Sequence, residues 1–429
     1  MARPIVIGLG GLGTVGQGLV RILAENQDVI RRRIGRDIVL KRVAVRDLAK
    51  NRGVALPPHA ILGADLGDLV RDPEIDIVCE LMGGLTAADR LIRDALAAGK
   101  HVVSANKHLL AERGQELFTL AHDAGRCLYY EASSVGGVPV VQALKESLAG
   151  NRILKLTGIM NGTANFILSE MTTGGIDFET ALAQAQALGY AEADPSFDID
   201  GIDTAHKLVL LARLAYGQHY PLDRLPKRGI RDVTPRDIEF AREFGYRIKL
   251  IGQVRQVDGM LEAGVFPALV KYTYLLARVG GNYNAVRIEG NAAGPIMLHG
   301  QGAGEMPTAS AVLADIMAIA RDEKNPNNTG FPENPLPEAD IQDPEDAISQ
   351  YYFRFQVADR PGVMAAITRV MADKRISIAQ ALQKGDEGAT DVPLVIITHE
   401  AKTRMVHEAL AEIDAMDFTV APTIHYRIL

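Results

Sequence analysis

The sequence predicts an α/β protein with three folded parts: a doubly wound parallel sheet, an α+β domain, and a small ferredoxin-like module at the C-terminus. Three observations support this class. Short apolar runs alternate with helical patterns at the start, longer helices and amphipathic strands follow, and a stretch rich in proline, asparagine and acidic residues precedes the last part. The 429 residues also exceed the roughly 100–200 typical of one domain.

The expected boundaries follow the changes of pattern, giving a sheet domain over 1–137, a middle domain over 138–321, a linker over 322–350 and a C-terminal module over 351–429. The first part contains the runs IVIGLG, IVLKRVAV, IDIVCELM, HVVSA and CLYYEA, separated by helical patterns. Strands that alternate with helical crossovers indicate a parallel sheet.

The C-terminal module has its own signature. YYFRFQV, ISIAQALQ, DVPLVIITH and TVAPTIHYRIL read as strands, and helices are expected over residues 362–374 and 402–416. The order β-α-β-β-α-β is that of a ferredoxin-like unit.

Composition excludes several classes of function. The net charge of -7 and pI near 5.9 provide no basic field for nucleic acid, and the apolar runs are too short to span a membrane. The N-terminus lacks the apolar core of a secretory signal. Cys79 and Cys127 are expected to be reduced thiols, and no cysteine and histidine spacing indicates zinc. We therefore expect a cytoplasmic protein without nucleic-acid or membrane partners.

The stretch IVIGLGGLGTVG contains the glycine fingerprint G-x-G-x-x-G in two overlapping registers. Apolar residues at 15, 19, 22 and 23 follow helical spacing, so the helix should start near Thr14. A helix N-terminus receives a pyrophosphate through its exposed N–H groups and its dipole. The expected dinucleotide turn is therefore Gly11, Leu12, Gly13, Thr14, Val15 and Gly16; a flexible turn without a ligand is the alternative.

Arg46 and Asp47 follow the second strand, where the ribose of a dinucleotide is read. An arginine there suits the 2′-phosphate of NADP, and a carboxylate suits the 2′-OH of NAD. Arg46 favours NADP(H), while Asp47 leaves NAD(H) open. A solvated charge pair remains the alternative to both.

Two lysines stand where a core pattern does not require them. Lys107 lies in the loop after a strand that ends at Ser104, at the edge of the sheet where ligands bind. Lys207 follows several carboxylates and precedes the apolar run LVLLA. An Asp203–Lys207 pair four residues apart on a helix is by itself a common surface ion pair, but the apolar run indicates a buried helix and a lined cleft.

Taken in order, five motifs resemble the homoserine dehydrogenase family. They are GLGTVG from Gly11, ELMGG from Glu80, SANK from Ser104, GIMNGT from Gly158 and DIDGIDTAHK from Asp198. The resemblance covers about residues 1–320, and DRPGV from Asp359 resembles an ACT regulatory domain. It implies a Rossmann-type nucleotide domain, a catalytic and dimerisation domain, and NAD(P)H-dependent reduction of L-aspartate 4-semialdehyde to L-homoserine in threonine, methionine and isoleucine biosynthesis.

The resemblance also implies roles for single residues. Lys207 would be the acid/base, with Lys107 as its neighbour, and an ammonium suits this chemistry because hydride transfer to an aldehyde builds negative charge on oxygen. The cationic amine of the substrate needs acidic partners. Those partners would be Glu192, Asp198 and Asp203, and the further cofactor positions would be Ser104, Lys107, Gly189 and Gly304. For Gly189 and Gly304, a helix cap or a tight turn is the alternative.

The stretch EASSVGGVP resembles the family's monovalent-cation loop. Glu131 and the backbone carbonyls of Ser134, Gly136 and Val138 would be the ligands of a sodium ion. The two serines depart from the usual pattern, in which valine follows one small polar residue, so the ligand set carries over less firmly.

Two other functions compete with this one. Aspartate-semialdehyde dehydrogenase needs a cysteine nucleophile, and neither Cys79 nor Cys127 lies in an activating turn. A non-catalytic sensor of a dinucleotide and an amino acid would not need both lysines. The resemblance further implies a homodimer or homotetramer and threonine as effector of residues 351–429, for which the turn at Pro361 and Gly362 offers free N–H groups. A purely structural module is the alternative.

Overall fold

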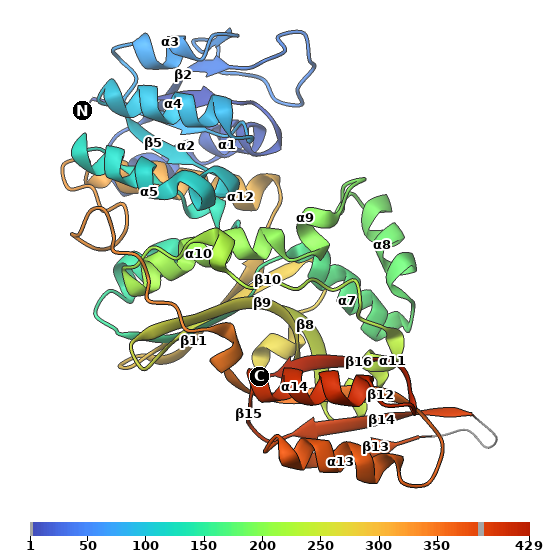
Figure 1. The fold of residues 1–429 in the computed structure, drawn as a ribbon. Helices are drawn as coiled ribbons and strands as arrows, with labels where there is room; N and C mark the ends of the chain where they lie inside the picture. The colour runs from blue at the N-terminus through green and yellow to red at the C-terminus, as the bar shows by residue number, and fades with distance from the viewer. Residues whose placement is uncertain (1–2, 385–389) are drawn as a thin grey trace. The chain divides into compact units, whose positions relative to one another are not determined.

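The computed structural model describes residues 3–384 and 390–429. The chain forms two compact units (Figure 1). The first comprises residues up to 162 with 203–225 and 282–339, and the second comprises 163–202, 226–281 and 340–429. The expected middle domain is thus divided between the two units.

A six-stranded parallel sheet forms the centre of the first unit. The strand order is β3-β2-β1-β4-β5-β6, and all neighbouring strands are parallel. From β1 the chain first adds strands on one side, to β3, and then crosses over to add β4, β5 and β6 on the other side. This is the doubly wound order in which ligands bind outside the carboxyl ends of the strands, at the switch point. The strands are β1 (Ile5–Gly10), β2 (Ile38–Ala44), β3 (Ile61–Gly63), β4 (Ile77–Glu80), β5 (His101–Ser104) and β6 (Leu128–Tyr129).

Helices cover both faces of this sheet (Figure 1). One layer contains α1 (Thr14–Glu25), α2 (Gln27–Ile34) and α12 (Glu305–Arg321), and the other contains α3 (Gly67–Arg71), α4 (Thr86–Ala97) and α5 (Lys107–Asp123). A Cβ at Gly18 would lie 2.7 Å from the Glu305 carbonyl oxygen, so this glycine permits α1 and α12 to cross closely. The return of the helix after Gly304 to the nucleotide domain, implied by the resemblance, is confirmed.

The rest of the first unit supports α10 (Ile202–Tyr216), which is buried from Asp203 to Ala215. The buried apolar run LVLLA explains this placement, as expected from the sequence. Three antiparallel strands, in the order β11-β10-β7, belong to the same unit. They are β7 (Ile153–Ile159), β10 (Tyr283–Gly290) and β11 (Gly294–Gln301), and the short helix α6 (Val140–Gln142) precedes them.

The expected linker is packed against the first unit over residues 322–339 rather than free. Asn328 is buried, accepts the Leu128 N–H at 2.8 Å and donates to the Arg126 carbonyl at 3.0 Å. Gln115 donates to the carbonyl of the buried Leu336. Polar side chains of this stretch bind backbone groups, so the stretch shows no apolar periodicity. Its composition predicted a linker, whereas residues 322–339 are ordered and belong to the first unit.

The second unit joins helices to a long hairpin and to the C-terminal module. The hairpin consists of β8 (Tyr246–Val257) and β9 (Met260–Lys271), and the helices are α7 (Gly162–Gly174), α8 (Phe178–Ala187), α9 (Ser196–Ile199) and α11 (Pro235–Glu243). The expected β-α-β-β-α-β order of the module is confirmed. It consists of β12 (Ile348–Ala358), α13 (Val363–Asp373), β13 (Ile378–Gln383), β14 (Asp391–Thr398), the short β15 (Ala401–Lys402), α14 (Thr403–Asp414) and β16 (Thr419–Ile428).

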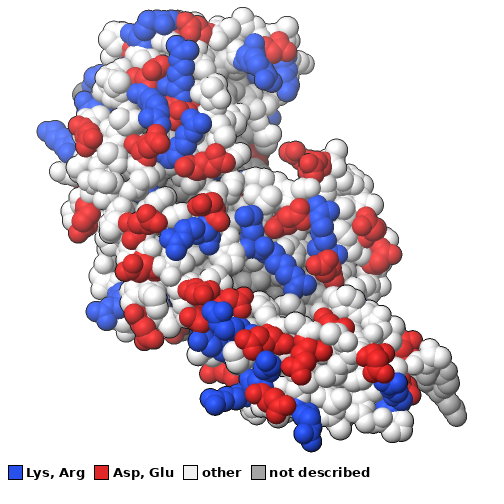
Figure 2. Space-filling view, viewed as in Figure 1, with Lys and Arg blue, Asp and Glu red and all other residues white. Residues whose placement is uncertain are grey.

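In the described ranges, no helix has the length and apolarity that a membrane span requires. On the face shown in Figure 2, basic and acidic side chains are interspersed.

Candidate active site

The glycine turn lies between β1 and α1, and the helix begins at Thr14 as expected. Gly11 has φ +97°, and a Cβ there would lie 2.7 Å from the Leu81 carbonyl oxygen. A Cβ at Gly16 would lie 2.5 Å from the Gly11 carbonyl oxygen, whereas Gly13 faces open space. Two glycines therefore close the turn, and the third leaves room for a pyrophosphate at the helix N-terminus.

A pocket opens beside this turn at the carboxyl ends of β1, β2 and β4. Arg46, Lys50 and Arg52 contribute its basic lining. Asp47 also lines it, but its carboxylate accepts the N–H groups of Ala49 at 2.9 Å and Lys50 at 3.2 Å. The aspartate thus shapes its own loop, and the surplus of charge in the pocket is positive.

The two lysines singled out from the sequence meet at one carboxylate. Lys107 Nζ lies 2.8 Å from Asp203 Oδ1, and Lys207 Nζ lies 2.7 Å from Asp203 Oδ2. Asn161 donates to Asp203 Oδ2 at 2.9 Å, and Lys207 donates to the Met160 carbonyl at 2.6 Å. All of these groups belong to the first unit.

Burial distinguishes this cluster from a surface ion pair. Asp203 is 2% exposed and Lys207 is 7% exposed, so the surface alternative is wrong. Burial opposes ionisation of Asp203, but the ammonium groups of Lys207 and Lys107 outweigh it and hold the pKa of this carboxyl below its ordinary range. The neighbouring His206 is buried as well, and burial lowers its pKa to about 4. At neutral pH the cluster thus places two ammonium groups around one carboxylate.

The position of Lys107 needs a small correction. It is the first residue of α5 rather than a loop residue, because the Asn106 side chain caps the helix by accepting the Leu109 N–H at 3.2 Å. The Lys107 side chain is 36% exposed, against 8% for Lys207. A ligand in solution can therefore reach Lys107, while Lys207 is enclosed.

Three other expected site residues, Gly189, Glu192 and Asp198, belong to the second unit. Gly189 has φ +74° and follows α8, and its N–H and that of Tyr190 donate to the carbonyls of Gln186 and Ala185. This is a Schellman helix cap, the local geometry that the alternative for Gly189 describes. Glu192 is exposed, and Asp198 lies in α9. In the first unit, Gly304 is the N-cap of α12 at φ +121°.

The candidate cation loop contains a buried carboxyl. Glu131 is 1% exposed and accepts the N–H groups of Val141 at 2.9 Å and Gln142 at 2.7 Å. Burial raises its pKa to about 7, and the neighbouring Asp315 adds to this shift. The loop takes a left-handed turn at Gly136. Asp315 is buried as well and accepts the Glu131 N–H at 2.7 Å, while the buried Lys145 favours the charged form of both carboxyls.

Neither thiol is arranged for covalent catalysis. Cys79 lies in β4 and Cys127 just before β6, and both are fully buried. Burial raises the pKa of both thiols, that of Cys127 to about 11. A thiol that stays protonated at neutral pH is a poor nucleophile, so the chemistry of an aspartate-semialdehyde dehydrogenase has no support.

Sequence reasoning missed the residues that hold these groups in place. Glu80, Asn106 and Asn161 lie inside the motifs that carried the resemblance, but their partners are distant in sequence. For Glu80, the sequence offered one signal: an acidic residue at the end of an apolar strand, where a core pattern alone does not require a charge.

Family models match most of the chain. A model described as homoserine dehydrogenase matches residues 139–317, and one described as its NAD binding domain matches residues 11–131. An ACT domain model matches residues 351–418.

Individual proteins are similar over the full length. The homoserine dehydrogenase of Pseudomonas aeruginosa is 40% identical and that of Bacillus subtilis 36%, with 98–99% of each chain covered. A homoserine dehydrogenase structure from Thiobacillus denitrificans has a TM-score of 0.94 at 43% identity, covering 100% of this chain and 98% of the other. A hyperthermophilic archaeal homoserine dehydrogenase in complex with NADPH has a TM-score of 0.62 at 27% identity, covering 76% and 99%.

Proposed function

Because the chain belongs to the homoserine dehydrogenase family, we propose that Lys207 is the proton donor when this oxidoreductase reduces L-aspartate 4-semialdehyde to L-homoserine. The observation that carries this role is the buried ammonium of Lys207, 2.7 Å from Asp203. The reverse reaction uses the same group as a base.

Four residues have separate roles in this reaction: Lys207, Lys107, Asp203 and Met160. The bound nicotinamide coenzyme supplies the hydride, and negative charge then develops on the aldehyde oxygen. Lys207 stabilises that charge and protonates the oxygen, while Lys107 adds a second positive charge. Asp203 and the Met160 carbonyl keep the Lys207 ammonium in a fixed position. Because Lys207 and Asp203 are buried, their electrostatic effect on the oxygen is stronger than in water.

The Lys207→Met variant tests this role. We expect kcat to fall by ~10²-fold or more, the scale of general acid–base catalysis, with nearly unchanged NADPH binding. The matched control is Lys100→Met, which removes another buried lysine, whose Nζ donates to the Asp72 and Ile75 carbonyls away from Asp203. This control should lower stability without changing kcat. If Lys207→Met retains most of its turnover, the donor is Lys107 or water.

For the coenzyme, we propose a preference for NADPH over NADH. Arg46 has Lys50 and Arg52 beside it in the pocket, and the Asp47 carboxylate is occupied by its own loop. A 2′-phosphate suits this surplus of positive charge. Arg46→Ala should raise the KM for NADPH by the equivalent of about 1–3 kcal/mol and leave NADH almost unchanged. An equal loss for both coenzymes would make the arginine structural.

For the substrate, we propose that Glu192 and Asp203 bind the cationic amine, supported by Asp198. Glu192 is an exposed carboxylate, so a ligand in solution can reach it. Glu192→Gln should raise the KM for homoserine more than it lowers kcat, which separate measurements of both constants would show. We further propose that Ser104, Gly189 and Gly304 lie along the coenzyme.

For the cation loop, we propose sodium bound by Glu131 and the carbonyls of Ser134, Gly136 and Val138. The support is geometric: Glu131 is buried, and its N–H donates to the buried Asp315 at 2.7 Å, so two carboxyl groups lie beside this loop. Stability in sodium chloride should exceed that in choline chloride at equal ionic strength. Glu131→Gln should abolish the difference, and equal stability of the wild type in both salts would remove the proposal.

For regulation, we propose that threonine binds the C-terminal module at the N-terminus of α13. Gly362 precedes this helix at φ +94°. Removing the module is a poor test, because β16 pairs with β9 and its loss would expose that strand. Met364→Glu instead places a repelling charge at the helix start, with Met364→Gln as control. Threonine inhibition should weaken by about 1–3 kcal/mol in the glutamate variant alone.

We also propose a homodimer or homotetramer in the cytoplasm. The two free, buried cysteines suit a reducing compartment. Light scattering of the purified chain measures the oligomeric state directly, and a monomer would remove that proposal.

A further inference from the structure

Glu80 is a buried carboxyl group that the mechanism above does not use. It is the last residue of β4 and is fully buried. Its Oε1 accepts the N–H groups of Met82 at 2.9 Å and Gly83 at 3.3 Å, and its Oε2 accepts the Ser104 hydroxyl at 2.7 Å. One side chain thus binds the loop after β4 and the last residue of the neighbouring strand β5.

Asn106 extends this network. Its N–H donates to Ser104 Oγ at 3.1 Å, its side-chain oxygen caps α5, and its side-chain amide donates to the Gly84 carbonyl at 2.7 Å. The hydrogen bonds therefore form a closed circuit from Glu80 through Ser104 and Asn106 to Gly84. The circuit starts at the last residue of β4 and ends in the loop that follows this strand.

The two connected loops carry different functional groups. Met82 and Gly83 line the basic pocket beside the glycine turn. Lys107 is the first residue of the capped helix and contacts Asp203. Burying a carboxyl is costly unless it is fully hydrogen-bonded, and β4 is otherwise an apolar strand. A residue needed only for packing would be apolar here.

We propose that Glu80 is a positioning residue that fixes the coenzyme pocket relative to Lys107, through Ser104 and Asn106. The inference rests on the proposed coenzyme pocket and the proposed role of Lys107. If those roles are wrong, the Arg46 and Lys207 variants reveal it independently of Glu80. A displacement of about 1 Å in such a site is enough to cost ~10²-fold in rate.

The test is a double-mutant cycle in the full chain with Glu80→Gln and Ser104→Ala. A glutamine has only one acceptor oxygen, so either the Ser104 hydroxyl or the loop N–H groups lose the acceptor that Glu80 provides. We expect Glu80→Gln to raise the KM for NADPH and to lower kcat, reducing kcat/KM at least ~10-fold. The double variant should lose no more than the worse single variant, because both break one network.

Val103→Ala is the matched control, since it creates a small cavity in β5 beside Ser104 outside the network. It should lower the melting temperature with unchanged KM, and its effect should add to that of Glu80→Gln. If Glu80→Gln does not fold, Asn106→Asp replaces it, because aspartate keeps the helix cap but loses the donor to Gly84. Wild-type KM and kcat in a folded Glu80→Gln or Asn106→Asp enzyme, or additive losses in the cycle, would overturn the proposal.

Discussion

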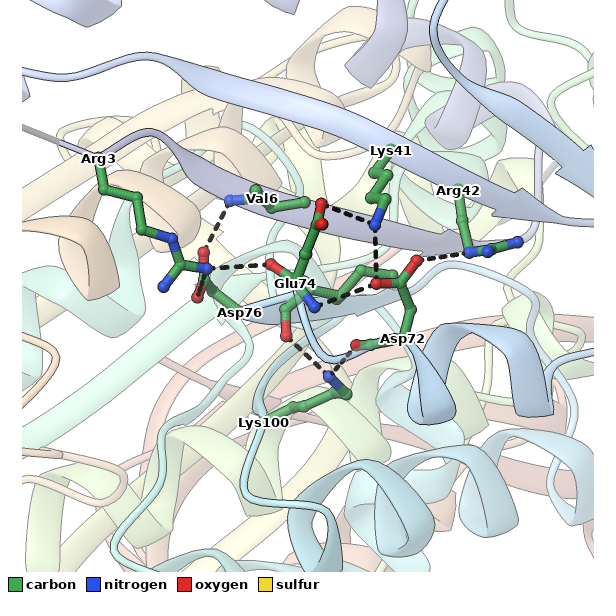
Figure 3. Close-up of polar contacts among 9 residues, drawn as sticks. Arg3, Val6, Lys41, Arg42, Asp72, Glu74, Asp76 and Lys100 are labelled. Carbon is green, nitrogen blue, oxygen red and sulfur yellow. Dashed lines mark hydrogen bonds and ion pairs between the residues drawn. The ribbon is translucent and has the colours of Figure 1, made fainter.

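Two buried carboxylates of the first unit, Asp72 and Asp203, are each bound by two cations but lie at opposite edges of the parallel sheet. Asp72 precedes β4, at the amino edge, and its oxygens lie 2.9 Å from Lys41 Nζ and 2.7 Å from Arg42 Nε (Figure 3). Asp203 contacts its two lysines at 2.7–2.8 Å. The local chemistry is nearly the same.

The surroundings differ. Lys41 also binds Glu74 at 2.8 Å, and Lys100 donates to the Asp72 carbonyl (Figure 3). The charged groups at the amino edge thus bind one another and neighbouring backbone. The Asp203 cluster instead lies with the residues that follow β5, on the side where ligands bind in doubly wound sheets. A carboxylate between two cations is thus not by itself a mark of catalysis; its place on the sheet decides its role.

The largest expected effect separates the two clusters directly. Asp203→Asn should lower kcat by ~10²-fold or more, because Lys207 and Lys107 would then share a neutral amide instead of a carboxylate. The measurement is kcat of enzyme shown by its circular dichroism spectrum to be folded. A folded variant with wild-type kcat would place Asp203 with Asp72 among the structural carboxylates.

The next largest effect is expected on the free energy of unfolding. Asp72→Asn should cost about 2 kcal/mol in urea unfolding while kcat and KM stay at wild-type values. Burial opposes ionisation of Asp72, but the hydrogen bonds from Arg42 and Lys41 outweigh it and hold its pKa below the ordinary range. Its contribution is therefore present above the unfolded pKa near 4 and is lost as pH falls below that value. The asparagine variant should lack this loss on acidification.

Much of the fold could be predicted because its signals are local. The strand runs, the helix start at Thr14 and the module order follow from apolar periodicity and glycine positions. The three-residue strand β3 is too short for a period to show. The packing of residues 322–339 on the first unit could not be predicted, because polar side chains there bind distant backbone groups and composition does not reveal such contacts.

The candidate site was predictable to the extent that its residues break a pattern. Lys107, Asp203 and Lys207 stand out as charges beside apolar runs, and the structure brings these three together. Glu80 and Asn161 contact groups 24 and 42 residues away in sequence. Such partners are set by tertiary packing, so no local pattern could assign them.

A third buried ionisable group, Lys249, differs from the two aspartates because its hydrogen-bond partners are uncharged oxygens. Lys249 in β8 donates to the Asn165 side chain at 2.8 Å and to the Val279 carbonyl at 2.6 Å. Burial, with some contribution from Arg247, lowers its pKa to about 7. The unfolded chain therefore binds more protons between pH 7 and about 10.4, and this group makes stability rise with pH there, by up to ~1.4 kcal/mol per unit. Urea unfolding of Lys249→Met across that range should show a flatter profile, and an unchanged slope would contradict the assignment.

The smallest effect is expected at the exposed end of the amino-edge network. Arg3 contacts Asp76 at 2.9 Å, but its side chain is 65% exposed (Figure 3). Exposed ion pairs contribute roughly 0–1 kcal/mol, and Asp76 is held independently because it accepts the Val6 N–H at 2.8 Å. Arg3→Ala should therefore change the free energy of unfolding by less than about 0.5 kcal/mol. Asp76→Ala should cost about 1 kcal/mol or more, since it removes the acceptor of a β1 backbone N–H. If the two variants are equally destabilising, the ion pair and not the backbone contact stabilises this edge, and exposure would be a poor guide to which charges of the network matter.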